Sequence, residues 1–242
     1  MNWSLMIESI PALLYGALVT VQLLVLTLLF GGLLALPLGI VAANGRKAFR
    51  LPVMGYITFF RGTPLLVQIF LVYYGLAQFP FIRASFLWPV LREAWVCALL
   101  TLALHTAAYT ANILRGAILA IPVGQTEAAV ASGMRPFLIY RLVILPQALR
   151  IGLPAYGNEM ISMAKATSLA STITIMELTG TANTIVARTY APYEVFISAA
   201  LIYLIIAWVL SRLARTLEAR LSRHMRPAPE AQKKNRSASV HA

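Results

Sequence analysis

Three polar side chains interrupt segments of the sequence that are otherwise apolar. Glu159, Arg61 and Asn112 lie about 9, 13 and 10 Å inside three separate segments, if each is a helix that rises about 1.5 Å per residue. An ionisable group at such a depth is costly and is by default a functional candidate. A guanidinium can bind a carboxylate through two parallel hydrogen bonds, so Arg61 is suited to an anionic group and Glu159 to a cationic one.

Glu159 has polar neighbours at helical spacing. Asn158, Ser162 and Lys165 are separated by four and three residues, and Glu159 and Ser162 are three apart, so the four side chains share one helix face. One interpretation is that this face lines a polar path. The other is that Arg61 and Glu159 form an internal ion pair that only neutralises two buried charges, and the sequence leaves both open.

The remaining reactive residues do not form a catalytic or metal site. His105 is the only histidine inside an apolar segment, and no Cys, Asp or second His is spaced to complete a metal site with it. We therefore expect His105 to make a hydrogen bond between helices. The single cysteine, Cys97, excludes an intramolecular disulfide. We expect no catalytic residue, no metal and no cofactor bound by this chain.

The elements that carry these residues are predicted to be membrane-spanning helices. The chain has 242 residues, is 60% hydrophobic and only 12% charged, and its mean hydropathy is +0.76. A soluble domain has about twice that charge fraction. A span needs roughly 20 apolar residues. The sequence predicts an all-α polytopic membrane protein with five spans at residues 19–43, 52–78, 94–119, 153–176 and 195–210.

The net charge of +12 is unevenly distributed. Of the 20 lysines and arginines, 14 fall on one side of the five spans: Arg46, Lys47, Arg50, Arg135, Arg141, Arg150, Arg212, Arg215, Arg220, Arg223, Arg226, Lys233, Lys234 and Arg236. The positive-inside rule makes this side cytoplasmic and predicts an N-out, C-in orientation. The basic residues have no stacking aromatics among them, so we expect the lipid bilayer and not nucleic acid as their partner.

The loop between the third and fourth spans has its own helical pattern. Residues 125–132 are rich in alanine, Gly133 is suited to a left-handed helix end, and Pro136 can begin a second helix. The pattern predicts a compact helical hairpin at the cytoplasmic surface. On periodicity alone, a plain amphipathic connection is the alternative.

The residues of this loop resemble a known motif. Glu127-Ala-Ala, then Gly133 and Ile144-Leu-Pro146, match the EAA loop of binding-protein-dependent ABC importer permeases. Further strings are similar to the polar amino-acid branch of that family, in particular its M-type subunit for histidine, lysine, arginine, ornithine or opines: Phe60-Arg-Gly-Thr-Pro-Leu-Leu-Val-Gln68, Ala107-Ala-Tyr-Thr-Ala111, Arg115-Gly-Ala-Ile118, Leu153-Pro-Ala-Tyr-Gly-Asn-Glu159 and Tyr190-Ala-Pro-Tyr193.

The resemblance implies a fold, a localisation and a division of the chain. It implies the MetI-like permease fold of type I ABC importers in the bacterial inner membrane. Residues 1–18 would be a periplasmic segment, 19–221 the transmembrane domain with its coupling loop at 120–150, and 222–242 a disordered basic cytoplasmic tail. The chain would be a permease subunit that imports basic amino acids or opines. Asn112 stands where many relatives have Glu, which keeps the opine alternative open.

The resemblance also implies partners that supply energy and substrate. The chain has no Gly-x-x-x-x-Gly-Lys-Ser/Thr motif, so ATP and Mg would be bound by a separate ATPase subunit. Two ATPase copies, a homologous second permease and a periplasmic binding protein would complete the importer. The coupling residues would be Glu127, Ala128, Ala129, Gly133 and Pro146, and the path residues Glu159, Asn158, Ser162, Arg61 and Asn112. An ATPase-independent channel or an ion-coupled amino-acid transporter is the alternative.

Overall fold

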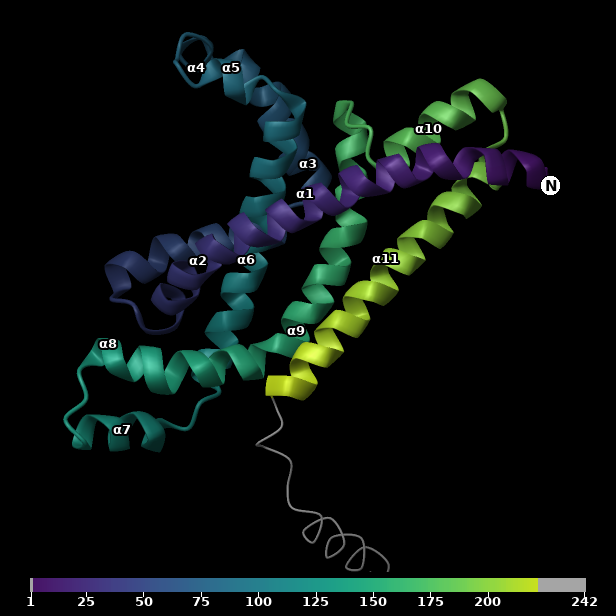
Figure 1. The fold of residues 1–242 in the computed structure, drawn as a ribbon. Coiled ribbons are helices and arrows are strands. Elements are labelled where there is room, and N and C mark those ends of the chain that lie inside the picture. Colours follow the sequence, from purple (N-terminus) through teal and green to yellow (C-terminus); the bar gives the residue numbers. More distant parts are fainter. Residues whose placement is uncertain (1, 222–242) are drawn as a thin grey trace, which may run out of the picture.

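The computed structural model describes residues 2–221, and every regular element in this range is helical (Figure 1). The candidate spans are α1 (Trp3–Asn44), α2 (Lys47–Gly62) with the bent run Leu65–Gln78 that begins with α3 (Leu65–Phe70), α6 (Ala94–Leu119), the run Pro136–Ile173 that contains α9 (Leu145–Ala166), and α11 (Pro192–Leu221). Shorter helices connect them: η1 (Leu71–Gly75), η2 (Leu76–Gln78), α4 (Pro80–Arg83), α5 (Trp88–Leu91), α7 (Val123–Ala131), α8 (Pro136–Ile139), η3 (Tyr140–Ile144), η4 (Thr167–Ile173) and α10 (Leu178–Thr189). Five predicted spans are thus found when the bent pair counts as one, while the predicted tail at 222–242 lies outside the described residues.

Helix α1 begins well before the predicted boundary at residue 19. The side chain of Asn2 caps it by accepting a hydrogen bond from the Leu5 amide at 3.2 Å, and residues 3–18 continue the same helix instead of forming a separate segment. This first part is helical because Leu13 and Ala17 pack against α10 and α11. At 42 residues, α1 is about 63 Å long, roughly twice the hydrocarbon core, so it must tilt or extend beyond the core.

The second predicted span is broken. Helices α2 and α3 meet at an angle of 107°, where Thr63 is extended with φ −113° and ψ 146°. Pro64 explains the break, because proline disfavours the helical conformation at the residue before it and has no amide hydrogen to donate. The predicted span over residues 52–78 is therefore found as a bent pair of helices.

The fourth span begins earlier than predicted and changes its helix type. Pro146 occupies the first turn of α9, as suits a residue without an amide hydrogen. After Ala166 the chain tightens into the 3-10 helix η4, whose hydroxyls donate to carbonyls three residues back, as Thr167 does to Ala164 at 2.8 Å. Local hydroxyl–carbonyl bonds of this kind compete with regular helix geometry. Thr174, with φ 70°, ends the span.

The two ends of the bundle carry different structures (Figure 1). The N-terminus lies beside α10, and helices α4 and α5 lie at the same end of the spans. The hairpin formed by α7 and α8 lies at the opposite end, as does the last described turn of α11. This arrangement agrees with an odd number of crossings between the N-terminus and the end of α11.

Small residues allow α1 and α6 to approach closely, and this is the most extensive contact between two described helices. A Cβ atom added at Gly31 would lie 2.8 Å from Thr106 Cγ2 and 3.0 Å from the Ala103 carbonyl oxygen. At Gly32, one residue further, an added Cβ would meet nothing within 4 Å. Association of helices in lipid depends on such close packing between small residues.

We expect Gly31→Ala to destabilise the protein and Gly32→Ala not to do so. The first substitution forces α1 and α6 apart and should lower the free energy of unfolding by about 1–3 kcal/mol. The second adds helix propensity and no clash. Thermal unfolding midpoints of the two purified variants measure the difference, and equal midpoints would contradict the packing described above.

Candidate functional site

Arg61 and Glu159 lie in the same region, where the last turn of α2 packs beside α6, which in turn packs against α9. The Arg61 guanidinium and the half-buried carboxylate of Glu159 are within the range at which two charges interact. The Arg61 guanidinium carbon is 5.3 Å from the centroid of the Tyr109 ring on α6, which is a cation–π distance. Asn112 is one turn further along α6 on the same face as Tyr109. The structure thus brings three of the predicted path residues to one region.

The two opposite charges do not neutralise each other by direct contact. Among residues 2–221 the one ion pair joins Arg92 and Glu93, whose side chains are solvent-exposed, at 3.6 Å. Arg61 is exposed and its guanidinium faces Tyr109 instead. The interpretation of Arg61 and Glu159 as an internal ion pair therefore has no support in this structure.

The polar stripe of α9 lies on the side that is not packed into the core of this chain. Asn158, Ser162 and Lys165 are exposed, whereas Met163 and Ala164, on the other side, are buried. Lys165 is in the last turn of α9, just before the 3-10 helix. The stripe and Arg61 are therefore accessible from outside the chain.

His105 makes the interhelical hydrogen bond that the sequence predicts. Its Nδ1 is 3.1 Å from Oε1 of Gln68, a residue of α3 that is only 3% exposed. Gln68 Nε2 also donates to backbone oxygens beside the break between α2 and α3. Within the described residues no group of three potential metal ligands is present.

A second polar site, which the sequence reading missed, is centred on Glu177. This carboxylate is fully buried and caps α10 by accepting from the amides of Thr179 and Gly180 at 2.9 and 2.8 Å. It also accepts from Tyr203 on α11 at 2.8 Å and from Thr20 on α1 at 3.3 Å. Burial raises the pKa of Glu177 above its ordinary value, although these hydrogen bonds oppose the shift.

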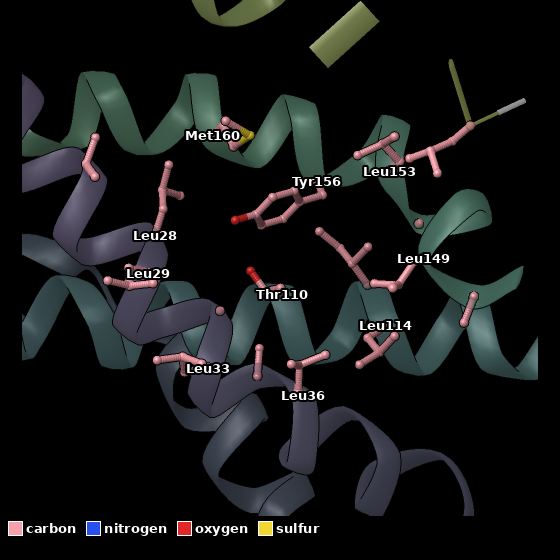
Figure 2. Close-up of a pocket in the computed structure, with 17 residues that line it drawn as sticks. Leu28, Leu29, Leu33, Leu36, Thr110, Leu114, Leu149, Leu153, Tyr156 and Met160 are labelled. Carbon is pink, nitrogen blue, oxygen red and sulfur yellow. The ribbon is translucent and has the colours of Figure 1, made fainter. Parts of the chain in front are cut away.

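A cavity of about 640 Å³ opens between α1, α6 and α9 (Figure 2). Its lining is almost entirely apolar and includes Leu28, Leu29, Leu33, Leu36, Leu114, Leu149, Leu153 and Met160. The hydroxyls of Thr110 and Tyr156 point toward it from α6 and α9 (Figure 2), and that of Thr110 has no hydrogen-bond partner in the described part of the chain. None of the predicted path residues lines this cavity, and its surface does not suit a zwitterion.

The hairpin of α7 and α8 forms as the sequence predicts. Gly133 has φ 74°, and the amides of Gly133 and Met134 donate to the carbonyls of Val130 and Ala129 at 2.9 and 3.1 Å. This is the Schellman arrangement, which satisfies the last carbonyls of a helix. Because Gly133 is left-handed, the chain reverses and α8 begins at Pro136.

The residues of the predicted coupling motif have different environments. Glu127 and Ala128 are exposed on α7, whereas Ala129 is buried against Ile139, Ile144 and Ala148. Pro146 is half-buried where α9 begins. Directly after the hairpin, the Tyr140 hydroxyl of η3 accepts a 2.7 Å hydrogen bond from the side chain of Asn44 at the end of α1.

The sequence matches a known family of transport proteins and several of its members. The family described as "Binding-protein-dependent transport system inner membrane component" matches residues 35–223. The chain is 50% identical over 211 residues to the octopine transport system permease protein OccM of Rhizobium meliloti, covering 87% of this chain and 86% of that protein. It is 42% identical over 214 residues to the histidine/lysine/arginine/ornithine transport system permease protein HisM of Escherichia coli strain K12, covering 88% and 90%.

The fold also matches a solved transporter. The crystal structure of an amino acid ABC transporter with histidines contains a chain with a TM-score of 0.80 and 34% sequence identity. The match covers 91% of this chain and 99% of that one. The predicted all-α permease fold is thereby confirmed.

Because burial raises the pKa of Glu177, we expect the stability of the protein to depend on pH. Because the folded-state pKa lies above the ordinary value of 4.5, the stabilising contribution of this group is present at low pH and is lost as the pH rises through the folded pKa. Thermal unfolding of wild type and Glu177→Gln should therefore be compared from pH 5 upward, at values spaced by about one unit. The stability of wild type relative to Glu177→Gln should fall with rising pH. A constant difference between wild type and Glu177→Gln would contradict the assignment.

Proposed function

This chain belongs to the family of binding-protein-dependent transport system inner membrane components, and we propose that it imports basic amino acids or the opines related to them. It is a multi-pass permease subunit. The substrate proposal rests on one observation above the others: Arg61 and Glu159 carry opposite charges in one region without forming an ion pair. Two separated charges of opposite sign suit a substrate that has both a carboxylate and a cationic end.

The substrate would lie between these charges. The Arg61 guanidinium would bind the carboxylate, and Glu159 would receive the cationic end, with Asn158, Ser162 and Asn112 as polar neighbours. Exposed Lys165 makes the path less negative than a site for dications alone would need. Opines carry a further carboxylate, so Lys165 and the neutral Asn112 support keeping them in the proposed substrate class beside the basic amino acids.

The rest of the importer would consist of separate chains. A homologous second permease, two copies of an ATPase and a periplasmic binding protein would complete it, and ATP and Mg would be bound by the ATPase. The α7–α8 hairpin and the last described turn of α11, which contains Arg220, lie at one end of the bundle, which supports a cytoplasmic position for that end (Figure 1). The N-terminus would be periplasmic.

The hairpin would transmit the work of ATP hydrolysis. Glu127 and Ala128 are exposed on α7 and would contact the ATPase, whereas buried Ala129 would hold the hairpin together. Gly133 would set the angle between α7 and α8 by its left-handed conformation. Pro146 would fix the point at which α9 begins, so that movement of the hairpin reorients the span that carries Glu159. Alternating access would follow from two orientations of the spans.

Comparing arginine with agmatine, its decarboxylated analogue, distinguishes the contact to the carboxylate from the contact to the guanidinium. In calorimetric binding to the permease–ATPase complex, Glu159→Gln should weaken both ligands, because both keep the guanidinium. Arg61→Gln should weaken arginine alone, by about tenfold to a hundredfold for a lost charged hydrogen bond. Unchanged arginine affinity in Glu159→Gln would refute the contact between Glu159 and the cationic end. Equal losses of affinity for arginine and agmatine in Arg61→Gln would refute the contact between Arg61 and the carboxylate.

The coupling role of the hairpin is tested at its turn. Gly133→Val should uncouple ATP hydrolysis from transport, because a β-branched residue resists a positive φ. Gly124→Ala in α7, which has open space and no such φ, is the matched control. Uptake per ATP hydrolysed, in proteoliposomes with the ATPase, is the measurement. Unchanged coupling in Gly133→Val would contradict this account, and transport by a preparation without any ATPase would favour a channel or an ion-coupled transporter.

A further inference from the structure

The break between α2 and α3 leaves backbone groups that need partners. The last carbonyls of a helix have no intrahelical donor, and inside a membrane water does not supply one. Gln68, from the next helix, supplies it: Nε2 lies 2.9 Å from the Phe60 carbonyl oxygen, 3.1 Å from that of Thr63 and 2.8 Å from Thr63 Oγ1. These two residues bracket Arg61, so Gln68 fixes the backbone on both sides of it.

The other end of the Gln68 side chain fixes a ring on α6. Since Nε2 donates to backbone oxygens, the amide is oriented with Oε1 toward His105 Nδ1, 3.1 Å away. A carbonyl oxygen only accepts, so Nδ1 of His105 carries the hydrogen. One buried amide therefore determines both the backbone at the break and the tautomer of His105.

The ring of His105 leads back to Arg61. It stacks on the Tyr109 ring with centroids 4.8 Å apart and an interplanar angle of 29°, and the Arg61 guanidinium carbon is 5.3 Å from the Tyr109 centroid. Gln68 is thus connected to Arg61 in two ways. It holds the backbone beside Arg61 directly, and through the rings of His105 and Tyr109 it supports the surface that the Arg61 side chain contacts. An exposed arginine without such support would lose its side-chain order.

We propose that Gln68, His105 and Tyr109 are positioning residues that hold the Arg61 guanidinium in place and thereby set the affinity for the carboxylate of the substrate. They act through Arg61 and do not touch the substrate. The inference rests on the proposed contact between Arg61 and the substrate carboxylate. In this proposal the three side chains determine substrate specificity in addition to packing α3 against α6.

Tyr109 offers the sharpest test, because no hydrogen bond involves its hydroxyl in the described part of the chain. Tyr109→Phe keeps the ring face and Tyr109→Leu removes it. In calorimetric binding to the permease–ATPase complex, Tyr109→Leu should weaken arginine by about two- to thirtyfold, the range of a cation–π contact, and leave agmatine unchanged. Tyr109→Phe should bind both ligands as wild type does.

A double variant decides whether Tyr109 acts through Arg61. In an Arg61→Gln background, Tyr109→Leu should cause no further loss of arginine affinity, since the group that it positions is gone. Additive losses, or equal losses of arginine and agmatine in Tyr109→Leu, would overturn the positioning role while leaving the Arg61 contact intact. Arginine affinity unchanged in Arg61→Gln alone would instead refute the proposed contact, and the inference with it.

Gln68→Leu tests the role of Gln68 itself. It should reproduce the selective loss of arginine affinity, because the backbone beside Arg61 and the His105 ring both lose their partner. Wild-type arginine affinity in an assembled Gln68→Leu complex would overturn the role of Gln68. Where this variant does not assemble, the Tyr109 pair, which leaves the backbone contacts at the break untouched, decides the proposal.

Discussion

A peptide group inside a membrane must find its hydrogen-bond partner within the protein, and the bend of the second span depends on this being achieved. Pro64 removes one donor and forces Thr63 out of the helix, which exposes carbonyls at the end of α2. Gln68 donates to two of these residues, and the Thr63 hydroxyl donates to the Phe59 carbonyl oxygen at 2.8 Å. With those bonds made, the chain can turn by 107° directly after the helical turn that carries Arg61 against Tyr109 of α6.

The sequence was informative where a residue type has one dominant physical use. Gly133 and Pro136 marked a left-handed turn and a helix start, and the structure confirms both. The third span at Ala94–Leu119 was also predicted with its bounds, because Glu93 and Pro122 flank an apolar run of helical length. In each case the local signal and the tertiary structure agree.

Other features depended on contacts that a single segment does not reveal. Hydropathy does not show that α1 extends back to Trp3, because that part is stabilised by α10 and α11 packing on one face. The buried role of Glu177 is not visible in its own segment, because its four donors come from three helices: Thr20 of α1, the Thr179 and Gly180 amides of α10, and Tyr203 of α11. Gln68 lay within a recognised string, and its polar amide in an apolar run was a signal that could have identified it.

Helix α1 connects parts of the molecule that are otherwise far apart. At its C-terminal end Asn44 donates to Tyr140 of η3, and about 36 Å away along the same helix Thr20 donates to Glu177 at the start of α10. Pro37 lies between them without ending the helix. Helix α1 is therefore hydrogen-bonded to η3 at its C-terminal end and to the Glu177 cap of α10 before its midpoint. Because one helix carries both contacts, a displacement of its C-terminal end along the helix axis would also load the hydrogen bonds of the Glu177 carboxylate.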